Sequence, residues 1–181
     1  MVKVFIIVTV ILIIFAIVMF YISKYNLMQF YITKIATSES IIDETLRIRY
    51  DLLNKMVKII KSKVKSTKEY FKDFTNLTND NISNFDFDRK LTEYITLCET
   101  VVNDHTVLDA NKDIKVLFNE LKNNEEKLVA TKNYYNKETS ELNHIVRKFP
   151  TNIIATIHRI KIRPFFDGKD MTDDIIDDFK I

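Results

Sequence analysis

Residues 4–23 read VFIIVTVILIIFAIVMFYIS, and this stretch decides the class of the chain because it holds no charged side chain. Fifteen of its 20 residues are Val, Ile, Leu or Phe. A helix of 20 residues is about 30 Å long, which matches the hydrocarbon core of a bilayer. Summed over these side chains, insertion into lipid is favourable by roughly 5–9 kcal/mol as an upper estimate. The sequence therefore predicts a single transmembrane anchor.

Two other interpretations of this stretch are a cleaved signal peptide and a buried core helix. The apolar core of a signal peptide has roughly 7–15 residues and ends at a small-residue cleavage site. Here the stretch runs into Tyr-Ile-Ser-Lys-Tyr-Asn at residues 21–26, which offers no such site. Lys3 precedes the span, and Lys24 and Lys34 follow it, so the distribution of charge leaves the orientation open.

The composition of the whole chain predicts an all-α protein. Its 181 residues include one Gly, two Pro and one Cys. The Gly and Pro residues are too few for the tight turns of a β-sandwich or barrel. The Gly-rich loops that cradle phosphates are absent from the sequence, and one Cys excludes an internal disulfide framework and a CxxC metal site. Residues 25–181 carry 25 basic and 25 acidic side chains, so no net positive field attracts nucleic acid.

Apolar periodicity predicts three helical stretches after the anchor. The first is expected from about residue 27 to about residue 74. Its stripe recurs at steps of four and three, at Ile42, Leu46, Arg49, Leu53, Met56 and Ile60. A polar break at residues 76–84 follows. The second helix is expected to start near Asp86 or Asp88 as N-cap, and its apolar face contains Cys98, which we expect to be buried and inert.

The third stretch carries a heptad seam. Its first line is spaced by seven residues, at Ile114, Leu121, Leu128, Tyr135, Leu142 and Phe149. A second line lies three residues before most of these positions, at Asn111, Phe118, Glu125, Lys132, Thr139 and Val146. Pro150 is expected to end this helix. A short fourth helix is expected from Thr151, as cap, to about residue 160, and the acidic tail at residues 167–181 is expected to be disordered.

Polar residues within these apolar patterns form the candidate site. A buried lone charge is costly, so we expect Arg49 to pair with Glu125 across two helices, with Lys132 nearby. Asn136 and Asn143 lie seven residues apart along the same seam and would fix its register. A ligand site in the bundle core is the alternative role. The full set of this predicted buried polar layer is Arg49, Asn54, Glu125, Lys132, Tyr135, Asn136 and Asn143.

Ordered motifs along residues 20–167 resemble those of the LemA family. They begin with Tyr25-Asn26 and continue with a run at residues 47–57, RIRYDLLNKMV, and with Ala110-Asn111. The third helix adds a series at Leu117, Leu121, Glu125, Leu128, Lys132, Tyr135-Asn136 and Asn143. The pattern closes with Phe149-Pro150, Asn152, Ala155 and Phe165-Phe166. Lys132 stands where the family usually has Arg, which weakens any bidentate pairing there.

The resemblance implies a membrane-anchored protein with an antiparallel four-helix bundle of three long helices and a short fourth. It also implies a short N-terminus outside the cell and a larger cytoplasmic part at the plasma membrane. We therefore expect an anchor at residues 1–24, a LemA-like bundle at residues 25–166 and the acidic tail at residues 167–181. The resemblance implies no reaction.

Three functions fit these observations. The first is a membrane-tethered scaffold that binds an unknown protein partner, motivated by one anchor and a long heptad seam. The second is an enzyme, which the sequence disfavours. His105, His144 and His158 lack a His or Cys partner at helical spacing, and Glu125 and Glu126 point to different helix faces. We therefore expect no catalytic, metal-binding or cofactor-binding residues and no cofactor. The third is a sensory bundle that signals through its first helix.

Overall fold

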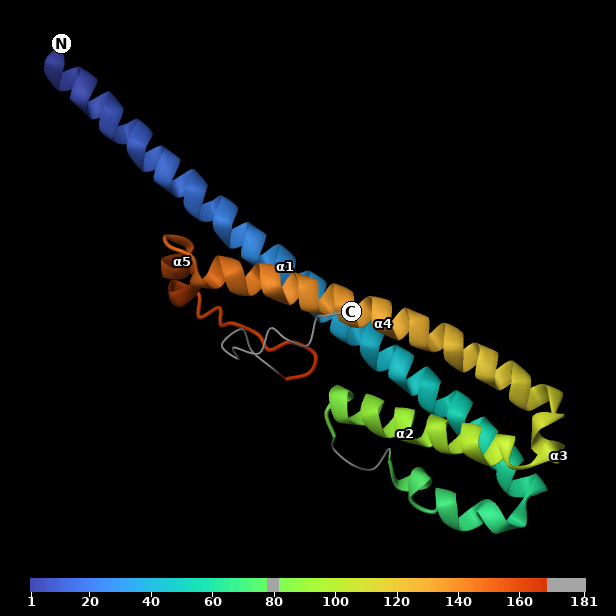
Figure 1. The fold of residues 1–181 in the computed structure, drawn as a ribbon. Helices are drawn as coiled ribbons and strands as arrows, with labels where there is room; N and C mark the ends of the chain where they lie inside the picture. The colour runs from blue at the N-terminus through green and yellow to red at the C-terminus, as the bar shows by residue number, and fades with distance from the viewer. Residues whose placement is uncertain (78–81, 169–181) are drawn as a thin grey trace, which may run out of the picture. The chain divides into compact units, whose positions relative to one another are not determined.

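The protein is described by a computed structural model that covers residues 1–77 and 82–168 (Figure 1). These residues form helices and connecting turns and contain no strand, which confirms the predicted all-α class. The elements in chain order are α1 (Val2–Lys63), η1 (Lys65–Phe71), η2 (Asp73–Asn76), α2 (Asn84–Asn103), α3 (Thr106–Asp109), α4 (Lys112–Arg147) and α5 (Thr151–Ile157). The predicted acidic tail lies outside the described residues from residue 169 onward.

The described helices divide into two compact units. The first unit joins residues 1–37 of α1 to residues 135–168, which include the end of α4 and all of α5. The second unit is residues 38–134, which include the end of α1, α2, α3 and the start of α4. The predicted boundary at residues 24 and 25 falls inside α1, where the helix continues without a break.

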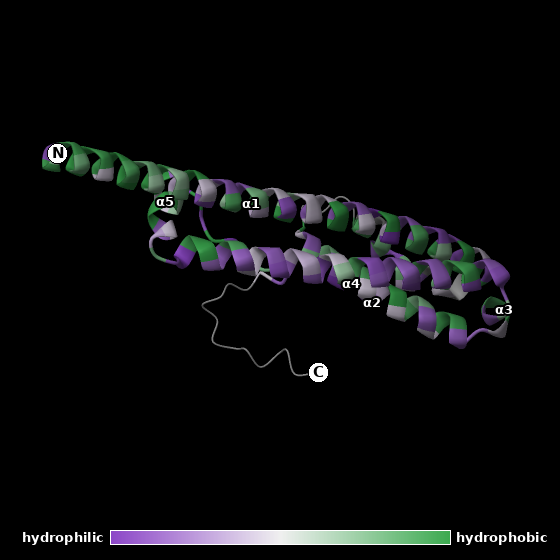
Figure 2. Cartoon of the chain, turned by 90° about the horizontal axis from the view of Figure 1, so that it is seen from above, coloured by the Kyte–Doolittle hydropathy of each residue, from purple (hydrophilic) through white to green (hydrophobic). Residues whose placement is uncertain are grey.

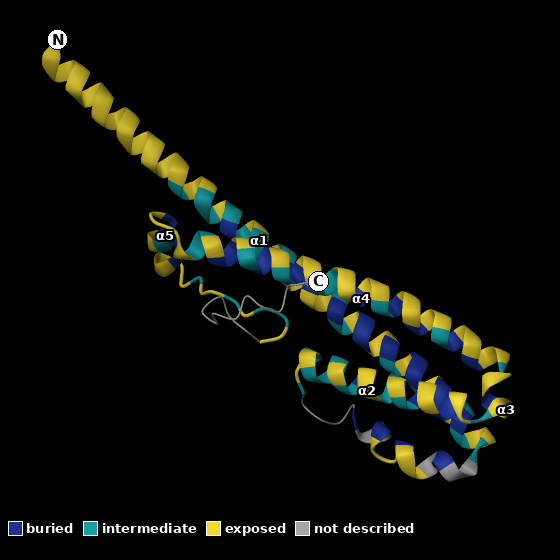
Figure 3. Cartoon of the chain, in the orientation of Figure 1, coloured by how far each residue is buried: buried dark blue, intermediate teal, exposed yellow. Residues whose placement is uncertain are grey.

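The N-terminal part of α1 has the character of a membrane span. Figure 2 shows it as predominantly hydrophobic, and Figure 3 shows the same part of the helix as mostly exposed. Within residues 1–77 and 82–168, α1 is the one helix long and apolar enough to cross a membrane, and its most apolar window is 0% buried. A soluble core helix would bury this surface against the protein, so the exposure disfavours that interpretation.

The first predicted helix is wrong at its C-terminal end, because α1 ends at Lys63 and not near residue 74. Val64 is extended, with φ −126° and ψ 96°, and the 3-10 helices η1 and η2 follow it. This turn lets Phe71 and Phe74 fold back and become fully buried. Phe74 stacks on Tyr50 of α1 with ring centroids 5.2 Å apart. The aromatic burial therefore outweighs the continuation of the helix.

The second unit has four main segments, which are the end of α1, the η1–η2 segment, α2 and the start of α4. The η1–η2 segment returns beside α1, so α2 runs in the same direction as α1, and α4 runs opposite to both (Figure 1). The core of this unit contains the whole predicted stripe of α1, from Ile42 to Ile60. It also contains Leu91 and Cys98 of α2, which confirms that Cys98 is buried.

The predicted start of α2 is wrong by a few residues. Ser83 is the N-cap, because its side-chain oxygen accepts a hydrogen bond from the backbone N–H of Asp86 at 3.1 Å. The Ser83 hydroxyl in turn donates to the Asp86 carboxylate at 2.8 Å. The carboxylate of Asp88, the other predicted cap, instead pairs with the Lys132 ammonium inside the second unit.

The heptad seam of α4 is present, but its second line lies on the other side of the first. Ile114, Leu121, Leu128, Tyr135 and Leu142 are buried as predicted, whereas Phe149 follows the end of the helix and is exposed. The predicted second line, three residues earlier, is half-buried except for Thr139. The deeper companions lie three residues later, at Leu117, Asn124 and Glu138.

The predicted cap of the fourth helix has a different role. Pro150 is the N-cap of α5, and the Thr151 hydroxyl donates to the carbonyl oxygens of Ile145 and Lys148 at the end of α4. Thr151 therefore satisfies carbonyl groups that the end of α4 leaves open. The helix α5 ends at Ile157, and Arg159 adopts the left-handed conformation, with φ 54°, that closes a helix C-terminus.

Candidate functional site

Arg49 is the centre of a charged network in the second unit. It lies between Leu46 and Leu53 on the buried stripe of α1, and its side chain is 4% exposed. Its guanidinium forms an ion pair with the Glu125 carboxylate of α4. It also donates from Nη2 to the Thr92 hydroxyl of α2 at 3.2 Å. The predicted pair of Arg49 and Glu125 is therefore present, and one side chain links three helices.

A second ion pair completes this network. The Lys132 ammonium of α4 lies 2.9 Å from Oδ2 of Asp88 on α2, so Lys132 pairs with Asp88. Burial lowers the pKa of Arg49, and the negative charge of Asp88 acts in the opposite direction and raises it. Two cations thus face two anions, and the network has no net charge. We call Arg49, Asp88, Glu125 and Lys132 the charged network.

Hydrogen bonding in the charged network is incomplete. The Nε atom of Arg49 and the Oδ1 atom of Asp88 are buried and have no hydrogen-bond partner within residues 1–77 and 82–168. Most buried polar atoms in proteins have a partner, either a protein group or an ordered water, so a water or another polar group can complete the hydrogen bonding at these two atoms.

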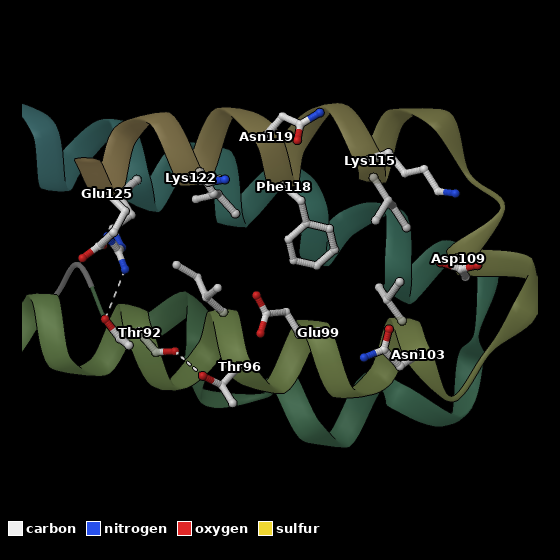
Figure 4. Close-up of a pocket in the computed structure, with 15 residues that line it drawn as sticks. Thr92, Thr96, Glu99, Asn103, Asp109, Lys115, Phe118, Asn119, Lys122 and Glu125 are labelled. Carbon is white, nitrogen blue, oxygen red and sulfur yellow. Dashed lines mark hydrogen bonds and ion pairs between the residues drawn. The ribbon is translucent and has the colours of Figure 1, made fainter. Parts of the chain in front are cut away.

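A cavity of about 700 Å³ opens beside the charged network, between α2 and α4. Figure 4 shows Phe118 of α4 and Glu99 of α2 pointing into the space between these helices. The lining of α4 extends from Ile114 to Glu125, which is about 16 Å along a helix. The apolar lining residues are Ile95, Val102, Ile114, Phe118 and Leu121, and the charged ones are Arg49, Lys115, Lys122, Glu99, Asp109 and Glu125.

Three of the predicted polar residues form a different group, in the first unit. Asn143 of α4 donates from its side chain to the Arg163 carbonyl at 2.7 Å and accepts from the Arg163 N–H at 2.8 Å. Asn136 accepts from the backbone N–H of Phe166 at 2.9 Å, and the Tyr135 hydroxyl donates to the Pro164 carbonyl at 3.1 Å. These side chains hold the segment at residues 160–168 along α4, where we expected them to set helix register.

The predicted set therefore does not form one layer. Arg49, Tyr135 and Asn143 are buried, whereas Asn54, Glu125, Lys132 and Asn136 are half-buried. Asn54 is not among the residues that line the cavity.

Sequence reasoning did not assign three charged or amide side chains that bind across helices, namely half-buried Asp88 and buried Asn124 and Glu138. Asp88 lies three residues before Leu91, so the apolar stripe of α2 could have been extended back to it. Asn124 donates from its side chain to the Thr45 carbonyl of α1 at 3.0 Å. Glu138 is buried and pairs with the Lys34 ammonium at 3.2 Å. Asn124 and Glu138 both lie three residues after a seam position, on the side of the seam that was not considered.

Cys98 has the properties of an unreactive thiol. Its side chain is fully buried in the core of the second unit. Burial, together with the nearby negative charge of Glu99, raises the pKa of the thiol to about 12. The thiolate needed for nucleophilic chemistry or metal binding is therefore scarce at neutral pH.

Comparison with known proteins identifies the family. The family model for the LemA family matches residues 38–176, which is most of the chain. A search of curated proteins and a search of solved structures gave no match. Together with the helical fold described above, the extent of the family match establishes that this chain belongs to the LemA family.

Proposed function

We propose that this chain is a membrane-anchored adaptor that binds a segment of a partner protein in the cavity between α2 and α4. The elongated shape of the cavity is the observation that carries the proposal. The lining covers about three turns of α4 and a similar length of α2, from Thr92 to Asn103. A space of this length suits a peptide or helix laid along the groove.

The chemistry of the lining supports a protein partner. Apolar side chains of Ile95, Phe118 and Leu121 would form the centre of the interface. Charges of both signs surround them, including Lys115, Lys122 and Glu99. Protein interfaces combine an apolar centre with a polar rim in the same way.

The anchor supplies the location in this proposal. Residues 4–23 would cross the plasma membrane, and the rest of the first unit together with the whole second unit would lie on the cytoplasmic side, as the family resemblance implies. Protease treatment of intact cells tests the side. Protection of the units agrees with the proposal, and their degradation from outside contradicts it.

Site-specific photo-crosslinking in native membranes tests the partner site. A photoreactive phenylalanine analogue at Phe118 should give a discrete adduct with one partner protein, because this side chain points into the cavity. The same analogue at Val116, which is exposed on α4 outside the cavity lining, is the matched control. The adduct at position 118 should be lost with Lys122→Glu and kept with Lys127→Glu. Equal adducts at both positions, or none at position 118, would contradict the proposal.

A second candidate function is sensing of a small anion in the same cavity. The buried Nε atom of Arg49 favours it, because this donor has no partner in the part of the chain that the structure describes and the side chain lines the cavity. Mass spectrometry of the purified full-length protein should then detect a co-purifying anion that Arg49→Met abolishes. A protein free of such a molecule in both forms contradicts sensing and leaves the adaptor proposal intact.

A further inference from the structure

An exposed apolar surface surrounds α5 in the first unit. Ile153 and Ile157 of α5 are 52% and 62% exposed, and Phe149 before the helix is 74% exposed. Ile162 after the helix is also exposed. We call these four residues the α5 apolar surface. Large apolar side chains gathered in this way usually mark an interaction surface.

The charged side chains in the stretch of sequence that contains this surface have one sign. Residues 142–166 contain five Lys or Arg residues and no Asp or Glu. Four of the basic side chains, Arg147, Lys148, Arg159 and Lys161, belong to residues exposed to solvent. In a chain that is balanced beyond residue 24, 25 consecutive residues without an acid form a local positive field. The surface thus combines the apolar and basic character of a helix that lies in a membrane interface.

Contacts within the first unit place α5 beside the candidate membrane span. The Tyr21 hydroxyl lies 2.6 Å from Nε2 of His158, and the rings of Tyr25 and His158 have centroids 4.3 Å apart. A cavity is lined on one side by residues of α1 from Ile13 to Tyr21 and on the other by Pro150, Ile153 and Ile154. The apolar side chains of α5 therefore lie at the depth of the C-terminal half of residues 4–23.

We infer that α5 and its flanking residues form a second membrane contact, which lies in the headgroup region of a leaflet rich in anionic lipid. Ile153 and Ile157 enter the outer part of the hydrocarbon, while Arg147, Lys148, Arg159 and Lys161 bind lipid phosphates. The basic charge specifies an anionic lipid surface, and the contacts with α1 bring that surface to the place where the span leaves the membrane. This inference rests on the proposed anchor, and the anchor does not require it.

Fluorescence of the full-length protein in vesicles tests this contact. A polarity-sensitive dye is attached to Ile157→Cys and, separately, to Ile153→Cys, while buried Cys98 stays unlabelled. The same dye on Ile14→Cys reports on the span, and on Val116→Cys, in the second unit, it serves as the exposed control. Vesicles of phosphatidylcholine mixed with phosphatidylglycerol carry either a quencher on the lipid chains or iodide in the water.

The expected result is quenching by the lipid quencher at positions 153, 157 and 14, and by iodide at position 116. Neutralisation by Arg159→Gln and Lys161→Gln should lower the ratio of lipid-embedded to exposed dye at position 157 by about fivefold for each residue changed. Lys55→Gln with Lys58→Gln, two exposed lysines of α1 in the second unit, is the matched control and should leave the ratio unchanged.

The outcomes separate this inference from the anchor. Iodide quenching at positions 153 and 157 with lipid quenching at position 14 overturns the second contact and leaves the anchor standing. Protection from both quenchers also overturns it, because the surface then packs on protein. Iodide quenching at position 14 overturns the anchor itself. An unchanged ratio after neutralisation, or the same ratio in pure phosphatidylcholine, overturns the assignment to anionic lipid.

Discussion

Asp88→Asn should destabilise the second unit more than Glu125→Gln, although both carboxylates belong to the charged network. The side chain of Asp88 is 13% exposed, and it faces both Lys132 and Arg49. Asp88→Asn leaves these two cations, which are 21% and 4% exposed, without their shared anion. Breaking a buried ion pair in this way costs about 3–5 kcal/mol. The side chain of Glu125 is 42% exposed, although the Oε2 atom that faces Arg49 is buried. Water therefore replaces only part of what Glu125→Gln removes, and the cost should be about 1–2 kcal/mol.

Pulsed alkylation of Cys98 measures these changes in the full-length protein. Cys98 is fully buried in the second unit, so it reacts when that unit unfolds, even if the apolar part of α1 stays in a micelle. Titration with urea then gives the free energy of unfolding for each variant. A cycle that combines Asp88→Asn with Arg49→Met should show a coupling of about 1–3 kcal/mol, because Asp88 loses one of its two cations in the Arg49→Met background.

Two results would refute this reasoning. One is a cost for Asp88→Asn below about 1 kcal/mol, the range of an exposed pair. The other is a cost for Glu125→Gln equal to or larger than that of Asp88→Asn. Either result would show that burial does not decide which anion stabilises Arg49.

Further predictions concern three other residues, Asn143, Cys98 and Thr151. Asn143→Ala should lower the stability of the first unit by about 1–3 kcal/mol and speed tryptic cleavage after Lys161, because it removes the hydrogen bonds to the backbone N–H and carbonyl of Arg163. Exposed Asn133→Ala is the control, and equal cleavage in the two variants would contradict the role of Asn143. Native Cys98 at pH 9 should react with iodoacetamide at least about 500-fold more slowly than in the unfolded chain, because its pKa is raised from 9.0 to about 12 and because the thiol is fully buried. The same shift stabilises the fold fully below pH 9 and less as the pH rises from 9 to about 12, so the slope of stability against pH in that window should be shallower in Cys98→Ala. Thr151→Val should destabilise the first unit by about 1 kcal/mol, measured by the same cleavage after Lys161, and an unchanged rate would show that the end of α4 needs no hydroxyl.

Apolar periodicity predicted the helices well where they pack against other helices. The stripe from Ile42 to Ile60 and the seam positions from Ile114 to Leu142 are buried, because a period of about 3.6 residues turns them all to one side. The pattern predicted the wrong end for α1, because apolar spacing alone does not show where the chain turns back on itself. Phe71 and Phe74 gain more from stacking near Tyr50 and Tyr94 than from extending α1.

The candidate site was predictable in part. A buried charge requires a partner of opposite charge, but this requirement does not specify where along the chain the partner lies. Because a buried lone charge is costly, we expected Arg49 to pair with an anion, and it forms an ion pair with the Glu125 carboxylate. The role of Asp88 was hidden because its position near a helix start suggested a cap. Asn136 and Asn143 bind a segment that is not helical, and no helical period can predict that contact.

Extraction of membranes with alkaline carbonate tests the central claim most directly, since the whole account depends on residues 4–23 spanning a bilayer. The full-length protein should stay in the membrane pellet, held by the roughly 5–9 kcal/mol that its apolar side chains contribute. A variant with Ile13→Arg and Ile14→Arg loses about 6 kcal/mol of this at the centre of the span and should move to the supernatant. Release of the unmodified protein into the supernatant would contradict the account.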